Sequence, residues 1–229
     1  ELSYALNNLG AVARDQGRTG EALGYFRRSA RIKSDVLATR PDDDALRYDL
    51  VDTLSWISSV DESEGRLRDA SAGYSEQIGM LRRLVANKPD ALLWQRRLAT
   101  SLLSCGALAA SRGLLDDAKA QIDEAIALLS SLTAREPGNQ GWAHDLALAH
   151  VEASEIAWIR GEDDSHRSHA RIAEALIRDI EASSQPTPAV RRLKAALHLL
   201  VASHPANDAT DAGWNAAIAT FEDNAARSK

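Results

Sequence analysis

The side chains best suited to chemistry are two aspartates and two histidines that lie close together in the sequence: Asp163, Asp164, His166 and His169. Two histidines three residues apart can share a metal ion when both lie on one face of a helix. Aspartate is also an ordinary residue at the start of a helix, and histidine is common on exposed surfaces. We therefore expect a helix start here. A metal-dependent regulator or an enzyme is the alternative, and metal analysis would decide between them.

The other reactive side chains occur in patterns that indicate packing. His150 and Cys105 both fall on apolar helical stripes, where a hydrogen-bonded histidine and a small buried thiol are expected. No serine has the strand–turn–helix surroundings of a nucleophile elbow, and no glycine-rich phosphate loop occurs. A single cysteine excludes an intramolecular disulfide. We expect no catalysis, no metal site and no cofactor.

Charge and hydropathy narrow the classes of partner. The 229 residues carry a formal net charge of -6, with acidic and basic side chains mixed throughout. Proteins that bind nucleic acids or anionic membranes usually show a basic excess or stripe. No apolar run approaches the roughly 18 residues that a membrane span requires. We predict a cytoplasmic protein with no nucleic acid or membrane partner.

The elements that position these residues are organised by a repeat of 48 residues. A period of roughly 20–50 residues is the signature of a repeat array. Three columns keep this interval. They are Gly17, Gly65, Gly113 and Gly161; Pro41, Pro89 and Pro137; and Leu2, Leu50, Leu98 and Leu146.

Each unit has room for two helices. Apolar residues spaced by four, three and four, as in Leu98, Leu102, Cys105 and Ala109, predict a first helix, helix A. Its end is expected at the glycine, which can adopt a positive φ. Helix B then runs for about 20 residues, starts on a threonine, aspartate or serine cap, and ends before the proline. Caps for the following helix A are expected at Asp42–Asp44, Asp90 and Asn139.

The 48-residue spacing of these columns is lost near residue 183. We predict four 48-residue helix-turn-helix repeats over residues 1–183 and a divergent pair of helices that caps the array over 184–229. The last helix would contain Trp214 and Phe221. The fold class is therefore all-α, with about ten antiparallel helices. Because the chain begins in mid-pattern at Glu1, we expect it to be a piece of a longer protein.

The columns of the first unit carry a family resemblance. Leu9-Gly10, Ala22 and Phe26 match the pattern of the tetratricopeptide repeat (TPR), which has a Leu-Gly pair, an alanine and then an aromatic residue. Later units match more loosely, and the fourth has His166 where the alanine belongs. The sequence resembles a long-period TPR. The segment Trp142–Leu146 is also similar to the Trp-x-x-Asp-Leu lead-in of repeats attached to bacterial signalling and effector proteins.

This resemblance implies a right-handed superhelix that binds a peptide or protein in a concave groove lined by the A helices. The chaperone-binding members hold a carboxylate with lysine and asparagine. Here only Asn7 could serve, and Asp52 and Glu62 would repel an anion. The groove positions that the resemblance implies are Tyr4, Asn7, Arg14, Asp52, Ser55, Glu62, Thr100, Leu103, Leu148, Val151, Glu155 and Trp158.

The leading functional hypothesis is a non-catalytic scaffold or sensor module of a larger bacterial protein, with a protein or peptide partner. A second hypothesis is self-association, in which an open end of the solenoid stacks on another copy to form a homodimer. Leu148, Val151 and Trp158 leave a further choice open. They form an exposed apolar patch, or the C-terminal helices cover them, with Trp214 or Phe221 filling the space.

Overall fold

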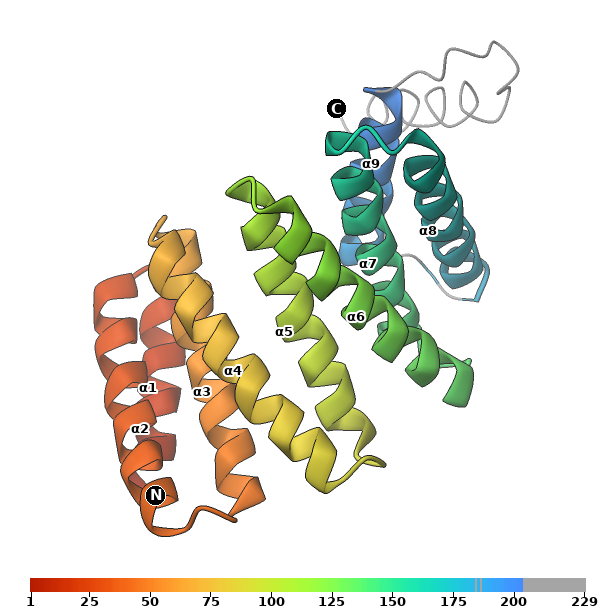
Figure 1. The fold of residues 1–229 in the computed structure, drawn as a ribbon. Coiled ribbons are helices and arrows are strands. Elements are labelled where there is room, and N and C mark those ends of the chain that lie inside the picture. Colours follow the sequence, from red (N-terminus) through yellow and green to blue (C-terminus); the bar gives the residue numbers. More distant parts are fainter. Residues whose placement is uncertain (184, 186, 204–229) are drawn as a thin grey trace. The chain divides into compact units, whose positions relative to one another are not determined.

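The computed structural model describes residues 1–183, 185 and 187–203, in which every regular element is an α-helix (Figure 1). The all-α prediction is confirmed. The described residues hold nine helices. The further helix expected around Trp214 and Phe221 lies outside them. The helices are α1 (Leu2–Asp15), α2 (Thr19–Thr39), α3 (Asp44–Ser63), α4 (Leu67–Asn87), α5 (Leu92–Ser111), α6 (Leu115–Arg135), α7 (Gln140–Ile159), α8 (Asp163–Ser183) and α9 (Pro188–Ala202).

The glycine column forms the turn from each A helix (α1, α3, α5, α7) to the B helix that follows it (α2, α4, α6, α8). All four glycines have positive φ, between 74° and 75°. At the first turn, the N–H of Gly17 donates to the carbonyl of Arg14 at 2.8 Å, and the N–H of Arg18 donates to that of Ala13 at 2.8 Å. This backbone conformation suits glycine because it has no Cβ.

Gly65 and Gly79 form a matched pair that tests this role. An added Cβ would meet no atom within 4 Å at either position, but Gly65 has φ +74° whereas Gly79 lies inside α4. Gly65→Ala should lower the free energy of unfolding by about 1–2 kcal/mol, since alanine is strained at positive φ. Gly79→Ala should raise it by about 0.5–1 kcal/mol through helix propensity. Urea denaturation measures both, and shifts of the same sign would contradict the backbone argument.

The helix caps follow the prediction only in part. Asp43 caps α3 by accepting from the N–H of Leu46 at 2.9 Å, and Asn139 caps α7 by accepting from that of Trp142 at 3.3 Å. The prediction of Asp90 is wrong, because α5 starts from Ala91 and has no side-chain cap. The predicted threonine, aspartate or serine caps are also wrong for α2 and α4, which follow an arginine. At these starts the tight glycine turn leads directly into the helix.

Residues Glu1–Leu128 form a first compact unit, unit 1. Here α1 and α5 pack closely against the B helices that follow them, because a glycine of the A helix leaves space for a large side chain. In the α3–α4 hairpin the glycine is Gly73 on the B helix, and it faces the hydroxyl of Ser58. A Cβ on Gly10 would lie 2.6 Å from the ring of Phe26, and one on Gly106 would lie 2.8 Å from Ile122. Phe26 and Ile122 are fully buried. The Leu-Gly position of the repeat is therefore a site of close helix contact.

Residues Leu129–Lys229 form a second compact unit, unit 2, and the boundary between the two falls inside α6. Within unit 2, α7 and α8 form a hairpin, and α9 packs against both helices. The N-cap of α9 is Thr187, which accepts from the N–H of Val190 at 3.3 Å. Its apolar stripe joins the core of the hairpin. The buried core consists of Ala147, Val151, Ala170, Ala173, Ile177, Ile180, Val190, Leu193, Leu197 and Val201.

Candidate functional site

The candidate site is a polar surface of unit 1 to which α1, α3 and α5 contribute, here called the A-helix face. Tyr4 of α1 exposes 53% of its surface and donates its hydroxyl hydrogen to the carboxylate of Asp49 on α3. This hydrogen bond is the main cause that raises the pKa of Tyr4, followed by burial and by the charge of Asp49. The phenol is thus held in place beside an acceptor, while much of the ring stays accessible.

Asn7 belongs to a network that sequence reasoning missed, because Lys33 enters it from a B helix. The Nζ of Lys33 donates to the carbonyl of Asp49 at 2.9 Å and to the Oγ1 of Thr53 at 2.8 Å. The hydroxyl of Thr53 donates to the same carbonyl of Asp49 at 3.0 Å. It therefore has no hydrogen left to donate to Asn7, and it accepts from the Nδ2 of Asn7 at 2.9 Å. The Oδ1 of Asn7 is buried with no hydrogen-bond partner. Burial lowers the pKa of Lys33, although Asp49 and Asp52 oppose the shift.

Asp52 and Ser55 are held by an arginine that the sequence did not single out. Arg97 of α5 donates from Nη2 to Asp52 at 2.7 Å and to Ser55 at 2.6 Å. Its positive charge offsets the negative charge expected from Asp52. Glu62 accepts a hydrogen bond of 2.7 Å from the hydroxyl of Tyr74 on α4, and burial together with Glu62 raises the pKa of that tyrosine.

Arg14 lies over an aromatic ring that was also missed. Its guanidinium carbon is 4.2 Å from the centroid of the Trp56 ring, and Trp56 stacks on Phe26 with centroids 6.3 Å apart. Arg14 also pairs with Asp15 at 2.7 Å. On α5, Thr100 donates to the carbonyl of its own helix at Arg97, at 3.0 Å. Leu103 is 5% exposed and offers no surface to a ligand in this structure.

In unit 2 the implied groove positions of α7 face a different environment. Val151 is buried in the core that α9 completes, and Leu148 packs against the same core. Glu155 and Trp158 are exposed. Of the two alternatives for the apolar positions, α9 covers Leu148 and Val151, whereas Trp214 and Phe221 lie outside the described residues.

The histidines of unit 2 pair across the α7–α8 hairpin. The Nδ1 atoms of His150 and His169 are 2.9 Å apart, and burial with the nearby His169 lowers the pKa of His150 to about 4. His166 is buried, with its Nδ1 2.9 Å from the Oγ of Ser154. Asp163 and Asp164 lie in the first turn of α8. Among the described residues, no group of three or more histidine, cysteine, aspartate or glutamate side chains could hold a metal ion.

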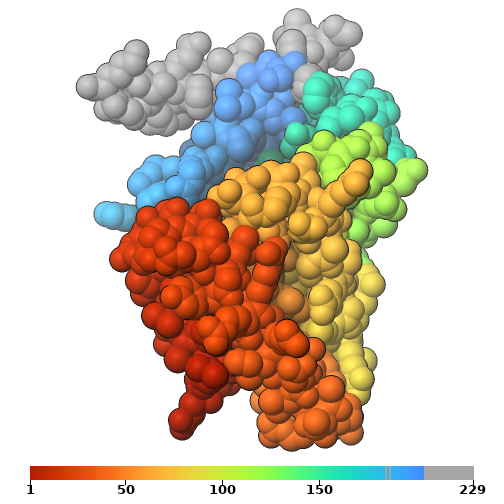
Figure 2. Space-filling model, turned by 90° about the vertical axis from the view of Figure 1, so that its left-hand side faces the viewer, coloured from red at the N-terminus to blue at the C-terminus, as the bar shows by residue number. Residues whose placement is uncertain are grey.

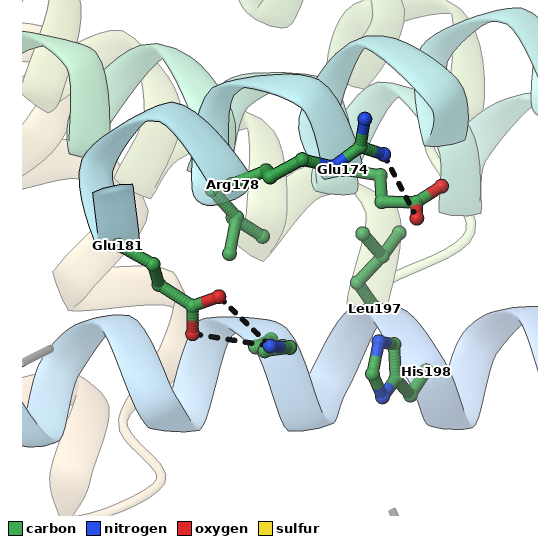
Figure 3. Close-up of a pocket in the computed structure, with 7 residues that line it drawn as sticks. Glu174, Arg178, Glu181, Leu197 and His198 are labelled. Carbon is green, nitrogen blue, oxygen red and sulfur yellow. Dashed lines mark hydrogen bonds and ion pairs between the residues drawn. The ribbon is translucent and has the colours of Figure 1, made fainter. Parts of the chain in front are cut away.

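A small pocket of about 80 Å³ lies between α8 and α9 (Figure 3). Its charged side chains are engaged with one another. Lys194 donates to Glu181 at 2.8 Å, and Arg178 donates to Glu174 at 3.3 Å. Burial, then Lys194, lowers the pKa of His198 at its edge. A pocket of this size with paired charges reflects the packing of α9.

Within the described residues, no helix is both long and apolar enough to cross a membrane. A search of curated proteins found no match. The family model of the tetratricopeptide repeat matches residues 2–41. The chain has a TPR-like fold. Its fold is shared with solved structures that are too distant in sequence to transfer function.

Three of these structures illustrate the TPR-like fold. BtubC (BKLC) from P. vanneervenii is 16% identical with a TM-score of 0.62, covering 82% of this chain and 67% of that one. Aspartyl phosphate phosphatase F from Bacillus subtilis is 13% identical with a TM-score of 0.66, covering 96% of this chain. This chain spans 48% of the phosphatase. A protein of nearly identical TPR-like repeats from Podosopora anserina is 12% identical with a TM-score of 0.61. The match covers 100% of this chain and 98% of that one.

Proposed function

We propose that this TPR-like chain is a non-catalytic scaffold that binds a peptide or protein segment on the A-helix face of unit 1. A TPR-like fold supports a protein-interaction role in general. What supports this particular face is that accessible polar groups on three A helices are tied together. The links are Tyr4 to Asp49 between α1 and α3, and Arg97 to Asp52 between α5 and α3. Side chains already held in place lose less entropy when they bind.

The chemistry of the face indicates the kind of partner. Arg14 and Arg97 are balanced by Asp15 and Asp52, so the face has little net charge to attract a strongly acidic or basic ligand. It offers carboxylate acceptors, a guanidinium donor and the accessible ring of Tyr4. An extended segment of low net charge fits these groups, because its backbone N–H and C=O groups match the acceptors and the donor. Glu155 and Trp158 are exposed positions of α7 in unit 2, so they lie outside this face and stay predicted binding positions. A bacterial origin and a cytoplasmic location stay predictions.

Selection of displayed random peptides on the full chain, followed by fluorescence anisotropy, tests the proposal. Tyr4→Ala and Arg97→Ala should each lower the affinity of the chain for the selected peptides at least tenfold. Arg82→Ala is the matched control, since Arg82 is an exposed arginine paired with Glu124 at 2.6 Å between two B helices. It should change the affinity less than twofold. Equal losses for all three variants, full binding by Tyr4→Ala and Arg97→Ala, or no selected peptide would overturn the proposal.

A further inference from the structure

A phenol and an indole meet near the N-terminal ends of α3 and α5. They belong to Tyr48 and Trp94, here called the aromatic pair. Their ring centroids lie 6.3 Å apart, and the ring planes are tilted by 31°. Both side chains are half-buried. Figure 2 shows the orange start of α3 beside the yellow residues that lead into α5. The pair therefore forms a small aromatic surface shared by two A helices.

The aromatic pair adjoins the A-helix face. Tyr48 lies one helical turn before Asp52, so both side chains project from the same side of α3. Burial is the main cause that raises the pKa of Tyr48. The positive charge of Arg97 then opposes this shift, and the negative charge of Asp52 adds to it. The hydroxyl of Tyr48 is thus within electrostatic range of the ion pair that links α5 to α3.

Each member of the aromatic pair carries a hydrogen-bond donor that is not used. Among the described residues, neither the hydroxyl of Tyr48 nor the Nε1–H of Trp94 has a hydrogen-bond partner, and neither atom is fully buried. When tyrosine and tryptophan are buried, these donors usually have a partner. The neighbouring carboxylate of Asp52, in contrast, already accepts from Arg97 at 2.7 Å. The aromatic pair offers ring faces and donors, so a matching ligand supplies acceptors.

We propose that the aromatic pair binds a proline-containing stretch of the partner segment in the polyproline II conformation. The inference rests on the proposed function, because it assigns a ligand class to the part of the surface that adjoins the A-helix face. Proline has no N–H, so a proline-rich stretch presents carbonyl acceptors without donors. Polyproline II has no internal hydrogen bonds, which leaves its carbonyls available to the phenol and the indole. Aromatic-lined surfaces are typical binding sites for such segments.

The geometry of the two rings fits this ligand. Successive residues of polyproline II rise by about 3.1 Å, so two residues span about 6 Å. This span matches the 6.3 Å between the ring centroids of Tyr48 and Trp94. The face of the Trp94 ring is accessible, because the Nζ of the exposed Lys88 lies over it, 5.6 Å from the centroid. A cation–π contact at an exposed site is weak, so a proline ring can replace the ammonium.

Fluorescence anisotropy of the full chain with a labelled peptide of ten prolines tests the inference. This peptide should bind at least tenfold more tightly than a glycine–serine peptide of equal length, which presents an N–H at every residue. Tyr48→Phe and Trp94→Phe should each weaken binding at least threefold, because phenylalanine keeps a ring but removes the donor. Tyr25→Phe is the matched control, since Tyr25 is a half-buried tyrosine of α2 that packs against the core of unit 1. It should leave the affinity unchanged.

The random-peptide selection separates failure of this inference from failure of the proposed function. Enrichment of proline among the selected peptides, together with the losses in Tyr48→Phe and Trp94→Phe, would support the inference. Selected peptides that depend on Tyr4 and Arg97 but are not enriched in proline would leave the proposed function standing and overturn the inference. Unchanged binding of the proline peptide by both phenylalanine variants would also overturn it. If neither the proline peptide nor any selected peptide binds, both proposals fail.

Discussion

Replacing Phe26 with alanine is expected to lower the free energy of unfolding of unit 1 by about 3–5 kcal/mol. Phe26 is fully buried, contacts the space left open by Gly10 and stacks on Trp56 with ring centroids 6.3 Å apart. Alanine would leave a cavity where α1, α2 and α3 meet. Urea denaturation followed by circular dichroism measures the loss, and a change below about 1 kcal/mol would contradict this account of the core.

Gly10 supplies the control for this experiment. An added Cβ would lie 2.6 and 2.7 Å from two ring atoms of Phe26, so Gly10→Ala alone should cost about 1–3 kcal/mol through overpacking. Phe26→Leu should cost less than half of what Phe26→Ala costs, because leucine fills much of the space. In the Phe26→Leu background, Gly10→Ala should cost less than it does in the native chain. Additive losses would show that the two residues do not share one contact.

The large pKa shifts of His150 and Glu152 in unit 2 predict two opposing dependences of its stability on pH. The pKa of His150 is lowered to about 4 from 6.5, chiefly by burial. Between pH 6.5 and 4 the imidazole is therefore protonated in the unfolded state but neutral in the native state. The free energy of unfolding falls by up to about 3 kcal/mol as the pH drops through this range. The pKa of Glu152 is raised to about 7 from 4.5, by burial and then by Glu155. The native state keeps that proton, so stability falls as the pH rises from 4.5 to 7.

The two dependences offset each other between pH 4.5 and 6.5, and single substitutions should separate them. Glu152→Gln removes the carboxyl, so its melting temperature should rise with pH across this range. His150→Gln removes the imidazole, so its melting temperature should fall with pH. Each variant controls for the other, because both are neutral replacements in α7. Parallel profiles for the two variants would contradict the opposite signs of the two pKa shifts.

Features that depend on local backbone geometry could be predicted from the amino-acid sequence. Four glycines 48 residues apart predicted four turns with positive φ, and all four have it. The prolines predicted where α2, α4 and α6 end, because a proline disfavours helix at the residue before it. The Leu9-Gly10, Ala22 and Phe26 pattern carried the TPR resemblance, and two of its residues, Gly10 and Phe26, meet where α1 packs against α2. Such features can be predicted from the sequence because they depend only on a residue type and its neighbours along the chain.

Which side chains meet across helices could not be predicted from the sequence, because it depends on how the helices pack. Lys33 and Arg97 reach the A-helix face from columns that were not expected to contribute, since long flexible side chains extend beyond their own helical position. The cover of α9 over Leu148 and Val151 depends on packing after the repeat register is lost. The burial of Ile57 and Val60 also depends on tertiary structure, because α2 packs against this face of α3.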